Sequence, residues 1–188
     1  MIGRLPVTLN VNGKELNIRT DFRDCLVILS AFNDTELTDY EKCAILIECL
    51  YRETVEITDL QEAFEKGVWF LDGGKETEND LSRPKLYDLE QDEQIIFSAI
   101  NKVAGKEIRS LDYMHFWTFL GLFNEIGEGT FSTVVSIRDK KRKGKKLEKW
   151  EQEFYRHNKE MVDLKKKHTK SEEEELNEVR KLLGIPLK

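Results

Sequence analysis

Residues 111–123 form the stretch that most limits what this chain can fold into. They read Leu-Asp-Tyr-Met-His-Phe-Trp-Thr-Phe-Leu-Gly-Leu-Phe, with only a thin polar line between the apolar side chains. As a helix, the stretch would present one broad apolar face with the spacing i, i+3, i+4, i+7 and i+10, formed by Tyr113, Phe116, Trp117, Leu120 and Phe123. Such a face must be covered by the chain itself or by a partner. We favour a core helix and keep Tyr113, Phe116 and Trp117 as candidate contact residues.

The N-terminal residues predict a β-hairpin. Apolar and polar residues alternate from 7 to 11 and again from 16 to 18, and Asn12-Gly13 between them is typical of a two-residue type I′ turn. This register places Leu9 opposite Leu16 and gathers the apolar side chains on one face. Because an isolated hairpin is not stable in water, we expect this face to lie on helices.

The rest of the chain predicts helices separated by caps and glycines. Two capping boxes are expected, one from Thr38 with Glu41 and one from Thr58 with Gln61. Further helix starts are predicted at Thr20 or Asp21, at Asp88 and at Thr130. The fold class is therefore mainly α, with an N-terminal β-hairpin packed on a multi-helix bundle and an extended C-terminal helical arm. We place the bundle with its hairpin at 1–137, and the basic connection with the helical arm at 138–188.

A second apolar pattern lies in the predicted arm, on an otherwise charged helix. Apolar residues and one histidine recur there in alternating steps of three and four, as in a coiled-coil seam. The candidate contact residues of this seam are Leu147, Trp150, Phe154, Met161 and Leu164. Docking on another helix and packing within the chain both remain open. A last capped helix is predicted to carry Leu176, Val179, Leu182 and Leu183.

Charge is distributed unevenly along the chain. Its net charge is −6, but Arg138–Lys188 holds 17 basic and 11 acidic residues and carries +6, so the first 137 residues carry −12. The strongest basic run could contact nucleic acid through Arg138, Lys140, Lys141, Arg142, Lys143, Lys145 and Lys146. A solvated basic connection is the favoured interpretation, because the acidic body would repel DNA.

The sequence offers no recognisable catalytic centre. Gly74-Lys75 is followed by Glu76 and so fails as a phosphate-binding loop, and no Ser, Cys or Thr lies beside an evident base. The three cysteines follow no metal-ligand spacing and are expected to be reduced. No apolar run approaches the roughly 20 residues of a membrane span. We expect a soluble cytoplasmic protein that is not an enzyme and needs no cofactor or metal.

Several motifs together resemble the bacteriophage gene-product-fifteen protein family of siphophage tail gene clusters. They follow the family's order and spacing over nearly the whole chain. The motifs are Asn17-Ile-Arg-Thr-Asp-Phe-Arg23, Val68-Trp-Phe-Leu-Asp-Gly-Gly74, Leu86-Tyr-Asp-Leu-Glu-Gln-Asp92, Ile95-Ile-Phe-Ser-Ala99, Leu111–Leu120 and Phe131–Arg138. The chain departs from the pattern at Tyr113-Met114, where many members carry two tryptophans.

The resemblance implies a tail assembly chaperone. Such a protein would bind the long helical tape-measure protein, keep it soluble, and give way as tail-tube subunits polymerise around it. Its partners would be the tape-measure protein, other tail assembly proteins and, as a further option, a second copy of itself. It would act in the bacterial host cytoplasm and be absent from the mature virion.

Overall fold

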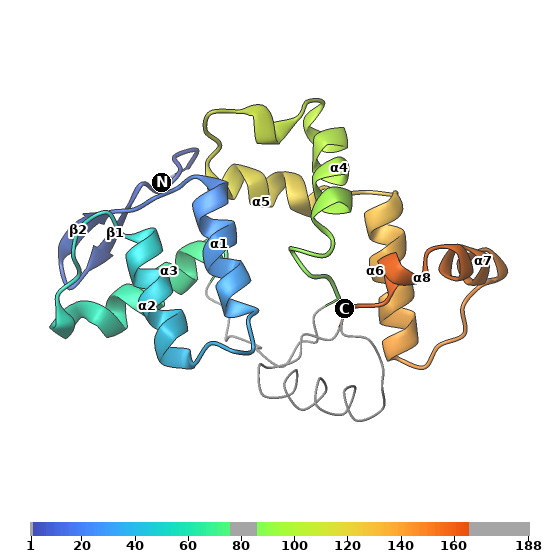
Figure 1. The fold of residues 1–188 in the computed structure, drawn as a ribbon. Coiled ribbons are helices and arrows are strands. Elements are labelled where there is room, and N and C mark those ends of the chain that lie inside the picture. Colours follow the sequence, from blue (N-terminus) through green and yellow to red (C-terminus); the bar gives the residue numbers. More distant parts are fainter. Residues whose placement is uncertain (1, 76–85, 166–188) are drawn as a thin grey trace, which may run out of the picture.

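The computed structural model describes residues 2–75 and 86–165. The chain is mainly α-helical, with an antiparallel N-terminal hairpin and a helical C-terminal region, as the sequence predicts. In Figure 1 the elements follow one another across the molecule, from the hairpin with α1 to α3, through α4 and α5, to α6, α7 and α8.

The hairpin consists of β1 (Thr8–Val11) and β2 (Lys14–Asn17). Its predicted register is confirmed, with Leu9 opposite Leu16. Asn12 and Gly13 have φ values of 48° and 81°, which is the left-handed backbone that a type I′ turn requires of both residues. The buried side of β1 packs on α3 (Leu60–Leu71).

Three helices complete the N-terminal part of the core. α1 (Phe22–Phe32) begins after Asp21, whose side chain accepts a hydrogen bond from the Arg23 amide. α2 (Asp39–Leu50) begins at the predicted capping box of Thr38 and Glu41.

The capping box predicted for α3 is wrong. A 3-10 turn, η1 (Ile57–Asp59), precedes α3 and makes Asp59 the residue before its first turn. The Asp59 carboxylate is held by the hairpin, because it accepts hydrogen bonds from Asn12 Nδ2 at 2.7 Å and Lys14 Nζ at 3.4 Å. The contact with the hairpin therefore fixes the start of this helix.

The middle of the chain contributes α4 (Glu93–Ala104), the 3-10 turn η2 (Ile108–Ser110) and α5 (Phe116–Asn124). The cap of α4 predicted at Asp88 is four residues early, because the residue that precedes the helix is Asp92. The Asp88 carboxylate accepts from the Glu90 and Gln91 amides, so it closes a turn that precedes the helix. Gly105, with φ 68°, ends α4 as predicted.

The aromatic helix predicted over 111–123 begins later than expected, at Phe116. The preceding residues are extended and pair with residues 20–22, since Phe22 N donates to Met114 O at 3.0 Å and Phe116 N donates to Thr20 O at 2.7 Å. These long-range bonds replace the ones that a helical turn would have formed. His115 then caps α5, with its Nδ1 accepting from the Trp117 amide at 3.0 Å.

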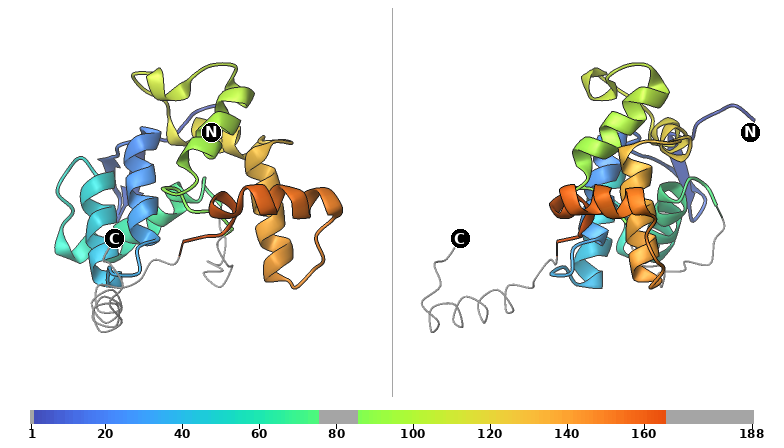
Figure 2. Two further views of the ribbon diagram at one scale, coloured as in Figure 1. Left: turned by 45° about the vertical axis from the view of Figure 1, so that its right-hand side comes forward. Right: turned by 90° about the vertical axis from the view of Figure 1, so that its right-hand side faces the viewer.

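The C-terminal elements are α6 (Thr130–Arg142), α7 (Lys149–His157) and α8 (Lys159–Val162). Figure 2 shows α7 and α8 lying across α6. The single seam helix predicted over 147–164 is wrong, because the chain breaks at Asn158, whose backbone has φ −126° and ψ 33°. The predicted boundary at 137/138 falls inside α6. Residues 166–188, including the last predicted helix, lie outside the described residues.

Among the described residues, the buried apolar side chains form two clusters. The larger one joins the hairpin, α1 to α5 and the first turn of α6. The smaller one contains Val134, Ile137 and Val162, against which Leu147 and Phe154 are packed. Because α6 contributes to both clusters, it connects the C-terminal elements to the main core.

Candidate protein-interaction surface

A buried arginine holds the C-terminal elements in place. Arg138 on α6 forms an ion pair with Asp92, at 2.5 Å from Nη1 and 2.9 Å from Nη2 to the two carboxylate oxygens. Nη1 also donates to Leu86 O at 3.1 Å, while Nε and Nη2 donate to Val162 O and Met161 O at 2.6 and 2.8 Å. All five N–H groups of the guanidinium are therefore used. One side chain thus joins α6, the start of α4 and the end of α8.

A second ion pair positions α7 against α6. Lys140 Nζ lies 2.7 and 2.8 Å from the two carboxylate oxygens of Glu151, which is buried. The hydrogen bond from Lys140 lowers the pKa of the Glu151 carboxyl. Beside this pair, Leu147 and Phe154 contact the smaller cluster. The inner side of α7 is therefore fixed by both charge and apolar packing.

The predicted seam residues divide between the interior and the solvent. Leu147 and Phe154 are half-buried inside the chain, as the packing alternative expects. Trp150, Met161 and Leu164 expose 56, 36 and 37 % of their surface. We call these three residues the exposed C-terminal set. They are large apolar side chains on elements that the Arg138 and Lys140 ion pairs hold in place, which suits contact with an apolar partner.

The aromatic stretch belongs mostly to the core. Phe116 is fully buried, and the half-buried Trp117 donates from Nε1 to Phe70 O at 2.9 Å. Tyr113 is 55 % exposed, and its hydroxyl is 2.8 Å from Thr20 Oγ1. Of the three candidates in this stretch, Tyr113 alone presents a large accessible surface.

Most of the basic run has acidic partners within the chain. Arg138 is buried, and Lys140, Lys141, Arg142 and Lys143 each lie within salt-bridge distance of a carboxylate. Within the described residues, the other two members of the run, Lys145 and Lys146, are exposed without an ion pair. Much of the positive charge that nucleic acid would need is therefore neutralised locally.

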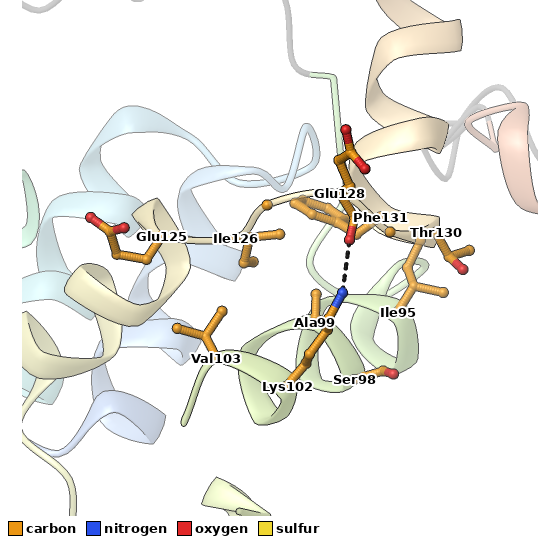
Figure 3. A pocket seen from close by; sticks show the side chains of 12 residues that line it. Ile95, Ser98, Ala99, Lys102, Val103, Glu125, Ile126, Glu128, Thr130 and Phe131 are labelled. Atoms are coloured by element: carbon orange, nitrogen blue, oxygen red, sulfur yellow. Dashed lines mark hydrogen bonds between the residues drawn. The ribbon is translucent and has the colours of Figure 1, made fainter. Parts of the chain in front are cut away.

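A pocket of about 470 Å³ lies between α4 and the loop that leads into α6 (Figure 3). Its polar lining includes Ser98, Thr130 and Lys102, and Lys102 Nζ donates to Glu128 O at 3.1 Å. None of the residues predicted to bind a partner lines it. The lining combines a tethered lysine, two hydroxyls and the carboxylates of Glu125 and Glu128.

The sequence profile of the family described as Bacteriophage Gp15 protein matches residues 1–164. The chain belongs to this family. The match covers the hairpin and every helix that the structure describes in this Gp15-family chain, so the predicted resemblance is confirmed. No curated protein and no solved structure matched the chain.

Two further observations concern other kinds of function. Among residues 2–75 and 86–165, no group of three or more His, Cys, Asp or Glu side chains is placed to hold a metal ion. No helix in the same ranges has both the length and the apolar character needed to cross a bilayer. That the Gp15-family chain is not an enzyme stays a prediction.

Sequence reasoning missed the residue that organises the site. Arg138 was assigned to a solvated basic run, whereas its side chain is buried against Asp92. One signal was available: Val134 and Phe131 lie four and seven residues earlier, so Arg138 shares their side of the helix. The partner, 46 residues away in the chain, had no comparable signal.

Proposed function

We propose that this Gp15-family chain is a non-enzymatic tail assembly chaperone that binds and solubilises the phage tape-measure protein while the tail tube assembles. The observation that carries the proposal is the exposed C-terminal set, in which Trp150 on α7, Met161 on α8 and Leu164 just after α8 lie in the region that the Arg138–Asp92 and Lys140–Glu151 ion pairs hold in place. Membership of a bacteriophage family supports a phage role.

The chemistry of this set suits a helical apolar partner. A tryptophan contributes a large contact area with little loss of side-chain freedom, and methionine adapts its shape to irregular partners. Exposed charged residues lie close to Trp150 in the sequence, at Lys149 and Glu153. Such a rim keeps an apolar contact soluble before the partner arrives. We propose that the chain acts in the host cytoplasm and that it is absent from the assembled virion.

Co-expression tests this function. The tape-measure protein would be produced with and without the chain, and its soluble fraction and its recovery with the tagged chain would be measured. We expect the chain to raise the soluble fraction and the triple variant Trp150→Lys, Met161→Lys, Leu164→Lys to lose both effects. Tyr40→Lys is the matched control, because Tyr40 is 83 % exposed on α2, outside the set.

Circular dichroism and thermal unfolding would establish that each variant is folded, since substitutions at exposed positions change stability little. A folded triple variant that solubilises the tape measure as well as the parent chain contradicts the proposal. Equal loss of binding in the Tyr40→Lys control would also contradict the assignment to this set. Mass spectrometry of purified virions tests the expected absence of the chain.

A further inference from the structure

A second apolar feature lies away from the exposed C-terminal set, in a groove of about 440 Å³ lined by residues of α1, the turn before α4, α4 and α5. Its floor consists of buried side chains, including Phe22, Phe97 and Phe119. Val27, on the α1 side, is 58 % exposed. An exposed β-branched side chain above a floor of aromatic rings is a surface that apolar side chains can cover.

The last described residues of the chain lie directly beside this groove. Gln91 receives a hydrogen bond from the Lys165 amide at 2.9 Å, and its own Nε2 donates to Asp163 O at 2.9 Å. Leu89 and Glu90, which immediately precede Gln91, line the groove. Lys165 is therefore hydrogen-bonded to the residue that follows Leu89 and Glu90 of the groove lining.

The sequence beyond this point has a matching pattern. Residues 172–183 are predicted to form a capped amphipathic helix about 18 Å long with Leu176, Val179, Leu182 and Leu183 on its apolar side. Six residues, 166–171, separate it from the anchor and can span up to roughly 20 Å. Along α1, the groove extends from Phe22 to Ser30, which is about 12 Å of helix. The linker is therefore long enough to place the segment anywhere in the groove.

Tethering favours this occupant over a separate molecule. Its apolar side chains, and not its charge, match the groove, because the lining carries Glu90 and Glu93 together with Arg23 and Arg109, while residues 172–183 hold five glutamates and two basic residues. A short linker also gives a tethered segment an effective concentration in the millimolar range. We infer that residues 172–183 dock in the groove between α1 and α4 of their own chain. The inference concerns the chain alone and does not depend on the proposed chaperone function.

Site-specific photo-cross-linking in the full-length chain tests this docking. A benzophenone amino acid would replace Val27, and cross-linked peptides would be identified by mass spectrometry. We expect cross-links within one chain to residues 172–183, and their loss in the variant Val179→Asp, Leu182→Asp. The same group at Tyr40, on α2, is the control and should not reach this segment. Cross-links between two chains, or none to this segment, overturn the inference.

Hydrogen exchange tests the same docking without placing a cross-linking group in the groove. In the full-length Val179→Asp, Leu182→Asp variant, amides in the exposed turns of α1 and at the start of α4 should exchange faster than in the parent chain. Amides of β1 and α2, which are remote from the groove, should be unchanged. Equal exchange of α1 and α4 in the two proteins overturns the docking.

Discussion

Removing the guanidinium of Arg138 should destabilise the chain strongly. In Arg138→Met, the apolar stem is kept but the Asp92 carboxylate loses both of its arginine donors. Asp92 is 2 % exposed, and the Asp88 amide, at 2.9 Å, is the hydrogen-bond donor that remains to it. The carbonyls of Leu86, Met161 and Val162 lose a donor as well.

The expected magnitude follows from this environment. Breaking a buried ion pair by removing one partner costs about 3–5 kcal/mol, because the remaining charge is uncompensated. Stabilities of folded domains are typically about 5–15 kcal/mol, so this loss is a large part of the total. The double variant Asp92→Asn, Arg138→Met should recover part of the lost free energy of unfolding, because the unpaired carboxylate charge is then absent.

The assay is urea unfolding of the full-length variants, followed by circular dichroism and tryptophan fluorescence. Coincidence of the two signals is needed for a single free energy of unfolding. Arg142→Met is the matched control, since its ion pair with Asp139 is partly exposed and should contribute less than about 1 kcal/mol. If Arg138→Met unfolds within about 1 kcal/mol of the parent chain, or no differently from Arg142→Met, the buried pair does not fix the C-terminal elements.

Three further outcomes follow from local geometry. His115→Ala removes the cap of α5 and the bond to the residue-6 carbonyl, so unfolding should become easier by about 1–2 kcal/mol, and His115→Ser should recover part of that loss in the same urea assay. Hydrogen bonds from Arg109 lower the pKa of Glu107 from 4.5 to about 2, so the stabilisation it gives is complete above about pH 4.5 and is lost as the pH falls towards 2. Carboxyl NMR should show this low midpoint, and Arg109→Gln should move it back towards 4.5; an unchanged midpoint would contradict the assignment. Because most of the basic run is internally paired, duplex DNA should bind the chain and its Lys145→Gln, Lys146→Gln variant equally weakly at low salt, and tight salt-dependent binding would refute this expectation.

Local features of the fold were predictable from the sequence because their causes lie within a few residues of one another. Asn12-Gly13 specifies its turn through the positive φ values that these residues tolerate. Thr38 and Glu41 satisfy each other's backbone amides across one helical turn. Gly105 ends α4 by adopting the left-handed conformation. The mainly α class, the hairpin and the family follow from such signals.

Long-range contacts decided what the sequence left open or misplaced. Residues 111–115 have the apolar spacing of a helix, yet they are not helical, and Met114 O and Phe116 N bond to the backbone of Phe22 and Thr20. Apolar spacing indicates that side chains must be shielded from water. It does not indicate which of them are buried within the chain and which are left for a partner. In the predicted seam, packing against the cluster of Val134 and Ile137 leaves Phe154 half-buried, whereas Trp150 is exposed.

The sequence by itself determined the hairpin, the helical class and the membership of a bacteriophage family, because these depend on local spacing and on the order of motifs. Only the tertiary structure decided that Arg138 is an internal anchor and not part of a solvated basic run. A buried guanidinium is stable only where a carboxylate and several carbonyl groups converge on it. That convergence brings together residues 86, 92, 138 and 162, which are distant in the chain and meet only after folding.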